Sequence, residues 1–216
     1  VGQAYAELKW LHDHWGYWGL NTLTSDEARC PIRKPGNHWD DSGYWKSLNS
    51  MTWDYKGKAI EWVWETSIEG ANLCNQIRSQ IAVYKDDVDP KQYAQFEAEL
   101  LVLRSYYYYA MFDLFGRIPY AEEYTSDKTA QFPLLDAKVV WKKLVDCLEA
   151  NVEYMPDANV PSKAQNYGRV TKGFAYALLA RLYLNAVSYG VDDVTDPYGK
   201  CIEYCNKVIN SNAYSI

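Results

Sequence analysis

The sequence has little positive charge and no long apolar run. Its 216 residues include 22 Lys and Arg against 28 Asp and Glu, which gives a net charge of −6. A nucleic-acid-binding protein needs clustered positive charge opposite the phosphate backbone, so this balance argues against a nucleic-acid partner. The longest apolar runs fall far short of the roughly 20 residues that a membrane helix needs, and no membrane-spanning helix is predicted.

Histidine and cysteine are also scarce, and their spacing favours neither a metal site nor a disulfide framework. The three histidines are His12, His14 and His38. On a helix His12 and His14 would point to different faces, so a metal site built from the three histidines and Asp40 is not predicted. We expect no metal and no cofactor. The five cysteines are odd in number and widely spaced, and are expected to be free, buried thiols: Cys30, Cys74, Cys147, Cys201 and Cys205.

The short motifs of common enzyme classes are missing as well. The sequence contains no Gly-x-Gly-x-x-Gly, P-loop, Gly-x-Ser-x-Gly, His-Glu-x-x-His or EF-hand motif. Glycosidic hydrolysis needs only two carboxylates, which can be remote in sequence, so a glycoside hydrolase of helical toroid fold stays an alternative. The candidate carboxylates are Asp26 with Glu27, Asp40 with Asp41, and Glu61 with Glu65. Each pair also fits a helix cap, a solvated face or a ligand hydrogen bond, and no catalytic residue is predicted.

Polar aromatic residues are what the sequence has in excess. Aromatic residues make up 16% of the chain, with 20 Tyr and 9 Trp against only 5 Phe. Tyr and Trp combine a flat apolar face with a polar group, which suits surfaces that are half buried and half wet. All the tryptophans except Trp141 lie within the first 64 residues. The first third of the chain therefore differs in character from the rest.

The rest of the chain has the periodicity of successive helices. Apolar residues recur at three- and four-residue spacing, and Pro, Gly and Asp stand where helices begin and end. Helices are predicted over 1–20, 59–85, 90–115, 136–153, 171–187 and 198–210. The predicted fold is all-α, an irregular tetratricopeptide-like superhelix of antiparallel helix pairs with long loops in the N-terminal third. We expect a single domain over 1–216, with a loop-rich aromatic segment at 1–58 and a helical scaffold at 59–216.

Tryptophan and charged residues alternate in the predicted loops after Leu20, which is a pattern suited to carbohydrate. A pyranose ring has an apolar face on which an aromatic ring can stack and a rim of hydroxyls that Asp, Asn or Arg can bracket. The predicted stacking platforms are Trp39, Trp45 and Trp53. The predicted hydroxyl partners are Asp26, Arg33 and Asp40.

Several longer segments resemble one known family. They are Glu97–Tyr109 running into Asp113–Pro119, Gly168–Leu184 and Cys205–Ser211, together with Thr24–Glu27, Pro31, Arg33 and Trp39–Trp45. In this order and over nearly the whole chain they resemble the SusD/RagB family. The resemblance implies a non-enzymatic, lipid-anchored protein at the outer face of a Gram-negative outer membrane. It also implies capture of oligosaccharides, or of peptides in some members, for a SusC-like TonB-dependent transporter.

The resemblance carries further expectations about this chain. It matches Asp26, Arg33 and Trp53 to residues that bind sugar in the starch-binding member, with helices as the scaffold that contacts the transporter. Members are more than twice this length, so the chain is expected to be an N-terminal portion, truncated at its C-terminus. Its lipidated cysteine is expected before Val1, and the anchor is the only expected membrane contact. A helical-repeat adaptor that binds a peptide stays a further alternative.

Overall fold

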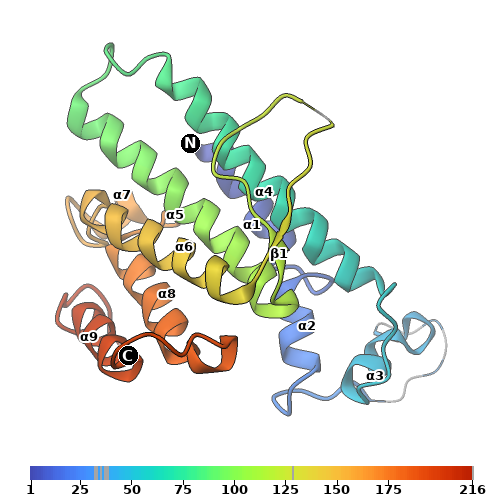
Figure 1. Cartoon of the computed structure of the whole chain (residues 1–216). Helices are drawn as coiled ribbons and strands as arrows, with labels where there is room; N and C mark the ends of the chain where they lie inside the picture. Colours follow the sequence, from blue (N-terminus) through green and yellow to red (C-terminus); the bar gives the residue numbers. More distant parts are fainter. Residues whose placement is uncertain (32–33, 35, 37–38, 128, 216) are drawn as a thin grey trace. The chain divides into compact units, whose positions relative to one another are not determined.

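The structure is a computed structural model that describes residues 1–31, 34, 36, 39–127 and 129–215 (Figure 1). The chain divides into two compact units, residues 2–70 and residues 71–216 together with Val1. The boundary lies inside helix α4 (Lys58–Ala82), whereas the loop-rich segment was expected to meet the scaffold at residue 58. No helix among the described residues has the length and apolar character needed to cross a membrane.

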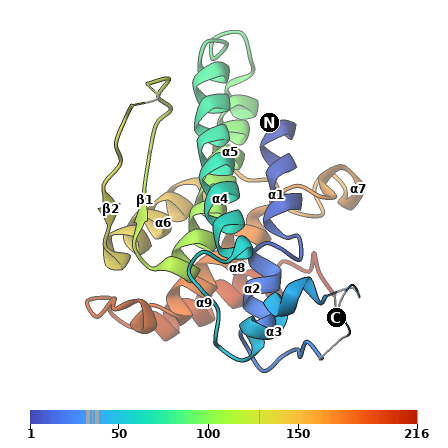
Figure 2. The ribbon, with the colours of Figure 1, turned by 90° about the vertical axis from the view of Figure 1, so that its right-hand side faces the viewer.

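The first unit is built from short helices. Its elements are η1 (Gly2–Tyr5), α1 (Ala6–Leu11), α2 (Tyr17–Leu23), η2 (Asp41–Gly43), α3 (Tyr44–Asn49) and the first part of α4. Helix α2 packs against α3 (Figure 2). The side chains of Leu11, Leu20, Trp45, Leu48 and Val63 form the core of this unit.

The predicted single helix over residues 1–20 is wrong, because the chain breaks after Leu11 and restarts at Tyr17. Glycines allow the chain to fold back on itself at this break. A Cβ at Gly16 would lie 2.1 Å from the carbonyl oxygen of Leu11, and one at Gly19 would lie 1.8 Å from that of His14. No side chain fits at either distance, so the two glycines are required for the turn.

The second unit begins with the end of α4, which is paired with α5 (Pro90–Phe115) as predicted. Asn75 Oδ1 accepts a hydrogen bond from Arg104 at 2.9 Å, and Arg78 forms an ion pair with Glu97 at 3.3 Å. The bounds of α5 match the prediction because Asp89 caps its first turn and Gly116, at φ +70°, ends it. From Ala98 to Phe112 most of the helix is buried, which confirms that it is packed on more than one side.

The remaining helices continue the scaffold. They are α6 (Ala137–Asn151), η3 (Val152–Tyr154), α7 (Lys163–Asn166), α8 (Lys172–Leu184), η4 (Val187–Tyr189) and α9 (Pro197–Ile209). Helix α6 packs on α5 and α8, and α9 packs on α8 (Figure 1). The predicted helices over 136–153, 171–187 and 198–210 are therefore confirmed, with 3-10 turns following α6 and α8.

Two details of the second unit correct the sequence predictions. Strands β1 (Ile118–Pro119) and β2 (Leu134–Leu135) pair antiparallel and close the loop between α5 and α6, although no strand was expected. Two-residue strands are too short to show an alternating pattern in the sequence. All five cysteines are free, but only Cys74 is buried: Cys30, Cys147 and Cys201 are half-buried and Cys205 on α9 is exposed, so the expectation of buried thiols holds for Cys74 alone.

Candidate functional site

The loop that carries Asp26 follows α2 and is held in place by a side chain of α3. Asn49 Nδ2 donates to the carbonyl oxygens of Leu23 at 2.6 Å and Ala28 at 3.1 Å. Asn49 Oδ1 accepts from the backbone amide of Cys30. The Asp26 side chain is exposed at the outside of this loop. One residue of α3 thus fixes both ends of a loop whose acidic side chain is available to a ligand.

The segment that carries Trp53 begins where α3 ends. The amide of Met51 donates to the carbonyl of Leu48 at 3.2 Å, and that of Thr52 donates to the carbonyl of Ser47 at 2.9 Å. This pair of bonds is a Schellman motif, in which the left-handed position usually holds glycine. Met51 occupies it at φ +55°. The direction in which the chain leaves α3 toward Trp53 is therefore fixed by hydrogen bonds at a strained residue.

Trp53 and Tyr55 are both open to solvent beyond this turn. The exposed fractions are 41% for Trp53 and 77% for Tyr55, and the exposed carboxylate of Asp54 stands between them in the sequence. Asp54 holds the backbone of this segment. Its carboxylate accepts a hydrogen bond from the amide of Lys56 at 2.8 Å, and its backbone carbonyl accepts one from the amide of Gly57 at 2.9 Å. Two exposed rings with an acid between them can supply both stacking and hydrogen bonds to a sugar. The sequence prediction named Trp53 and missed Tyr55.

The other predicted tryptophans lie in a cluster of aromatic rings between α1, α2 and α3. Six residues form this aromatic cluster: His14, Trp15, Trp18, Trp39, Tyr44 and Trp45. The ring centroids of Trp15 and Trp45 are 4.4 Å apart, and those of Trp39 and Trp45 are 4.9 Å apart. The Nζ of Lys58 stands 4.5 Å from the Trp15 centroid. The cluster is therefore tightly packed around Trp45.

Trp45 is completely buried, so the assignment of Trp45 as a stacking platform is wrong. Its indole lies at the centre of the cluster and donates to the Asp41 carboxylate, and no ring face is left for a sugar. Trp39 is half-buried at the edge of the cluster, and Trp18 is 48% exposed beside it, with ring centroids 6.4 Å apart. Trp18 was missed because the sequence placed it inside one continuous helix.

The backbone before α3 is unusually strained. Trp39, Asp41 and Ser42 have φ values of +66°, +37° and +56°, and none of them is glycine. Left-handed conformations of such residues cost on the order of 1–3 kcal/mol each and are kept only where the surrounding structure fixes them. Trp39 holds this left-handed conformation while its ring packs against His14, Trp18 and Trp45.

Arg33, a predicted hydroxyl partner, lies outside the described residues, as does His38. Of the other histidines, His14 pairs with Asp13 and lies against Trp39 at 5.3 Å, while the His12 ring lies at 6.3 Å from Tyr17. Within the described part of the chain no group of three or more His, Cys, Asp or Glu could hold a metal ion.

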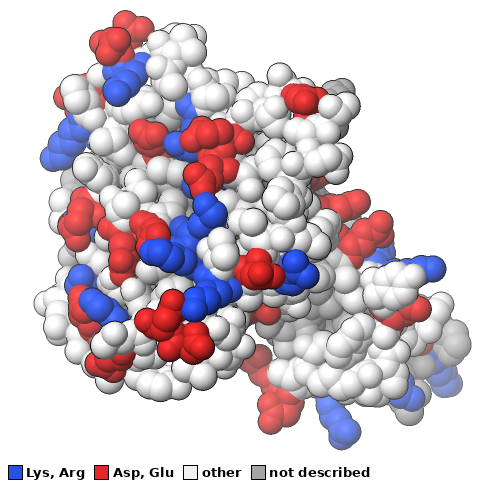
Figure 3. All heavy atoms as spheres, viewed as in Figure 1, with Lys and Arg blue, Asp and Glu red and all other residues white. Residues whose placement is uncertain are grey.

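The candidate carboxylates have separate surroundings. Asp41 accepts the Trp45 indole hydrogen, Asp40 is half-buried, and Asp26 and Glu27 are exposed on their loop. Glu61 and Glu65 lie on the exposed side of α4. On the face of the molecule seen in Figure 3, basic and acidic side chains are intermixed. This distribution is not that of a surface that attracts a polyanion.

The aromatic segment and the helical scaffold are both covered by the match to one protein family. A sequence model described as "Starch-binding associating with outer membrane" matches residues 19–184, which include the Asp26 loop, Trp53 and α5 to α8. The chain belongs to the SusD-like family. A curated SusD-like relative, the starch-binding protein SusD of Bacteroides thetaiotaomicron, is 28% identical over 178 residues. The match covers 82% of this chain but only 30% of that protein.

Solved structures show the same fold. Surface glycan-binding protein A from Bacteroides fluxus superposes with a TM-score of 0.75 at 23% identity, over 100% of this chain and 43% of that one. Its counterpart from Bacteroides uniformis gives 0.74 at 23% identity, over 99% and 45%. A laminarin binding SusD-like protein gives 0.71 at 20% identity, over 96% and 43%. The chain therefore spans less than half the length of these relatives, and shares their fold over nearly all of its own.

Proposed function

We propose that this SusD-like chain binds oligosaccharide without catalysis, as part of a nutrient-capture protein on the outer-membrane surface. In this proposal the exposed pair Trp53 and Tyr55 stacks on sugar rings, and Asp26 and Trp39 supply further contacts. Arg33 is included from the sequence prediction. The protein would be held at the membrane by a lipid anchor and would deliver its ligand to a SusC-like TonB-dependent transporter.

The observation that carries this proposal is the placement of Trp53 and Tyr55. Both rings are exposed on a segment whose backbone is fixed by the end of α3, and α3 also holds the Asp26 loop through Asn49. Rigid placement lowers the entropy lost on binding, which matters for weak sugar contacts. A flat ring and a carboxylate are the two kinds of group that a pyranose face and its hydroxyls require.

The names of the family and of similar proteins support the class of ligand. The family is described as starch-binding, and similar proteins carry the names starch-binding, laminarin binding and glycan-binding. Starch and laminarin are neutral glucose polymers, so a neutral glucan is the first ligand to test. Delivery to a transporter and lipid anchoring rest on the family resemblance, and a pull-down of the full-length protein from its native membrane would test the transporter partner.

Calorimetry with maltoheptaose and a laminarin oligosaccharide tests the sugar site. We expect Trp53→Ala to weaken binding about tenfold, which corresponds to about 1.4 kcal/mol, and Tyr55→Ala and Asp26→Ala to weaken it less. Trp10→Ala is the matched control, because Trp10 is 43% exposed, close to the 41% of Trp53, and lies on α1. Unchanged affinity in Trp53→Ala, with a ligand that the parent chain binds, would refute the assignment.

A further inference from the structure

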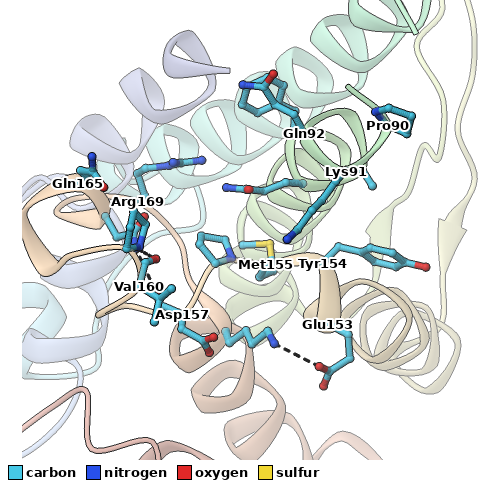
Figure 4. Close-up of a pocket in the computed structure, with 17 residues that line it drawn as sticks. Pro90, Lys91, Gln92, Glu153, Tyr154, Met155, Asp157, Val160, Gln165 and Arg169 are labelled. Atoms are coloured by element: carbon cyan, nitrogen blue, oxygen red, sulfur yellow. Dashed lines mark hydrogen bonds and ion pairs between the residues drawn. The ribbon is translucent and has the colours of Figure 1, made fainter. Parts of the chain in front are cut away.

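The second unit contains a hollow of about 900 Å³ that shares no lining residue with the proposed sugar site. It lies between the first turns of α5, the segment that follows η3, and α7 (Figure 4). Its volume is at the upper end of the roughly 300–1,000 Å³ range of ligand pockets. The hollow is therefore large enough for a ligand of several rings.

The walls of this hollow combine an apolar base with amide side chains. Phe96, Met155 and Pro156 contribute apolar surface, while Gln92, Gln95 and Gln165 contribute amides. In Figure 4 Lys91 extends from α5 over Met155, and Gln165 and Arg169 lie on the opposite side. Amide groups both donate and accept hydrogen bonds, as hydroxyl groups of a sugar require.

A second hollow of about 530 Å³ continues the first along α8 and α9. The two share four lining residues, Glu153, Asp157, Val160 and Lys172. Tyr176 and Tyr214 line the second hollow, with Asn159 and Asn210. The two hollows together form one groove, which we call the scaffold groove. This groove is longer than a single sugar. Its form suits a chain of linked units.

The charges in the first hollow nearly cancel. Arg169 forms a two-point ion pair with the buried Glu99, at 2.6 and 3.1 Å, and Lys172 pairs with Glu153 at 3.3 Å. Lys91 and Asp157, one of each sign, form no ion pair with any residue that the structure describes. A groove without excess charge has no electrostatic preference for a polyanion or a polycation.

We infer that the scaffold groove is a second binding site for a neutral oligosaccharide. The ligand's hydroxyls would meet Lys91, Asp157 and the glutamine amides, and its C–H faces would lie on the apolar base. A peptide is the less suitable occupant, because no sheet edge borders the described lining and the groove has no cluster of unpaired cations for a carboxylate terminus. This inference rests on the proposed function, since it assigns the same ligand class to another surface.

Stoichiometry separates the two sites. With maltoheptaose or a laminarin oligosaccharide, calorimetry of the parent chain should give two binding events, and Trp53→Ala should leave the groove event unchanged. The double variant Lys91→Ala/Gln165→Ala should weaken the groove event at least tenfold and leave the other. Lys163→Ala is the matched control, because Lys163 is an exposed lysine on α7 that is absent from the lining of both hollows. Amide chemical shifts at residues 91–95, 153–155 and 157 should move with the groove event.

The outcomes are distinguishable. A single event that Trp53→Ala weakens and the groove variant does not would overturn the second site and leave the proposed function intact. An event lost only in the groove variant would support the groove and refute the Trp53 assignment. Binding of extended peptides at residues 91–95, with no response to either sugar, would overturn the ligand class. No binding of any sugar would overturn both.

Discussion

Asn49→Ala should destabilise the first unit and loosen the loop that carries Asp26. The substitution removes the hydrogen bonds to Leu23 at 2.6 Å and Ala28 at 3.1 Å, and the bond from the amide of Cys30. At a net value of about 1 kcal/mol for each bond, the free energy of unfolding should fall by about 3 kcal/mol. Because Asn49 is half-buried, water can replace part of this loss, and about 2–3 kcal/mol is the expected range.

Tryptophan fluorescence during urea unfolding isolates this effect. All nine tryptophans except Trp141 lie in the first unit, so the fluorescence change reports mainly on that unit. With a urea dependence of about 1–3 kcal/mol per molar, a loss of about 3 kcal/mol moves the midpoint down by about 1–3 M. Far-ultraviolet circular dichroism follows the helices of both units and should shift less.

Two further variants test whether the hydrogen bonds of Asn49 hold this loop. Asn49→Asp keeps the acceptor for Cys30 but loses both donated bonds, so it should lie between Asn49→Ala and the parent chain. Asn21→Ala is the matched control, because Asn21 makes one bond at 3.1 Å, to Tyr17 within its own helix, and should cost less than about 1 kcal/mol. If Asn49→Ala lowered the free energy of unfolding by less than about 1 kcal/mol, the hydrogen bonds of Asn49 would not be what holds the loop that carries Asp26.

Five other substitutions, at four residues, test other parts of the structure. Trp45→Ala should cost about 3–5 kcal/mol in urea unfolding because it empties a fully buried site, whereas Trp53→Ala should change the unfolding free energy by less than about 1 kcal/mol. Met51→Gly should stabilise the first unit by about 0.5–1 kcal/mol by relieving its φ of +55°, and Met51→Val should destabilise it. Hydrogen bonds from Tyr176 and Lys172 lower the pKa of the Glu153 carboxyl below 4.5. The ionised carboxylate therefore stabilises the folded state fully above pH 4.5, and this contribution is lost as the pH falls through the lowered pKa. Glu153→Gln should remove that part of the pH dependence of stability between pH 6 and 3, and an unchanged profile would refute it.

The helical scaffold was predictable from the sequence because its signals are local. Asp89 and Pro90 begin α5, Gly116 ends it, and the apolar stripe between them needs no information from distant residues. The first unit was less predictable because distant contacts decide it. The break before Tyr17 depends on backbone that folds back against Gly16, and no periodicity records that contact.

The roles of single residues in the candidate site also depend on distant contacts that the local sequence does not record. Trp45 and Trp53 are eight positions apart in similar surroundings, yet one is fully buried and the other is 41% exposed. Composition indicates that tryptophan matters here, but burial depends on which ring the aromatic cluster encloses. Asn49 could not be identified at all, because its role is to bond residues 19 to 26 positions away.

The buried and exposed tryptophans are parts of one arrangement. Trp39 and Met51 both hold left-handed backbone, at φ +66° and +55°, on the two sides of α3. Each left-handed conformation costs on the order of 1–3 kcal/mol. The burial of Trp45 at the centre of the aromatic cluster stabilises the unit by enough to offset these costs. Trp45→Ala should therefore weaken sugar binding through loss of this packing, although Trp45 cannot touch a ligand. Trp53→Ala should weaken binding while the fold stays stable. If Trp45→Ala stayed folded with full affinity, the exposed rings would not depend on the buried one.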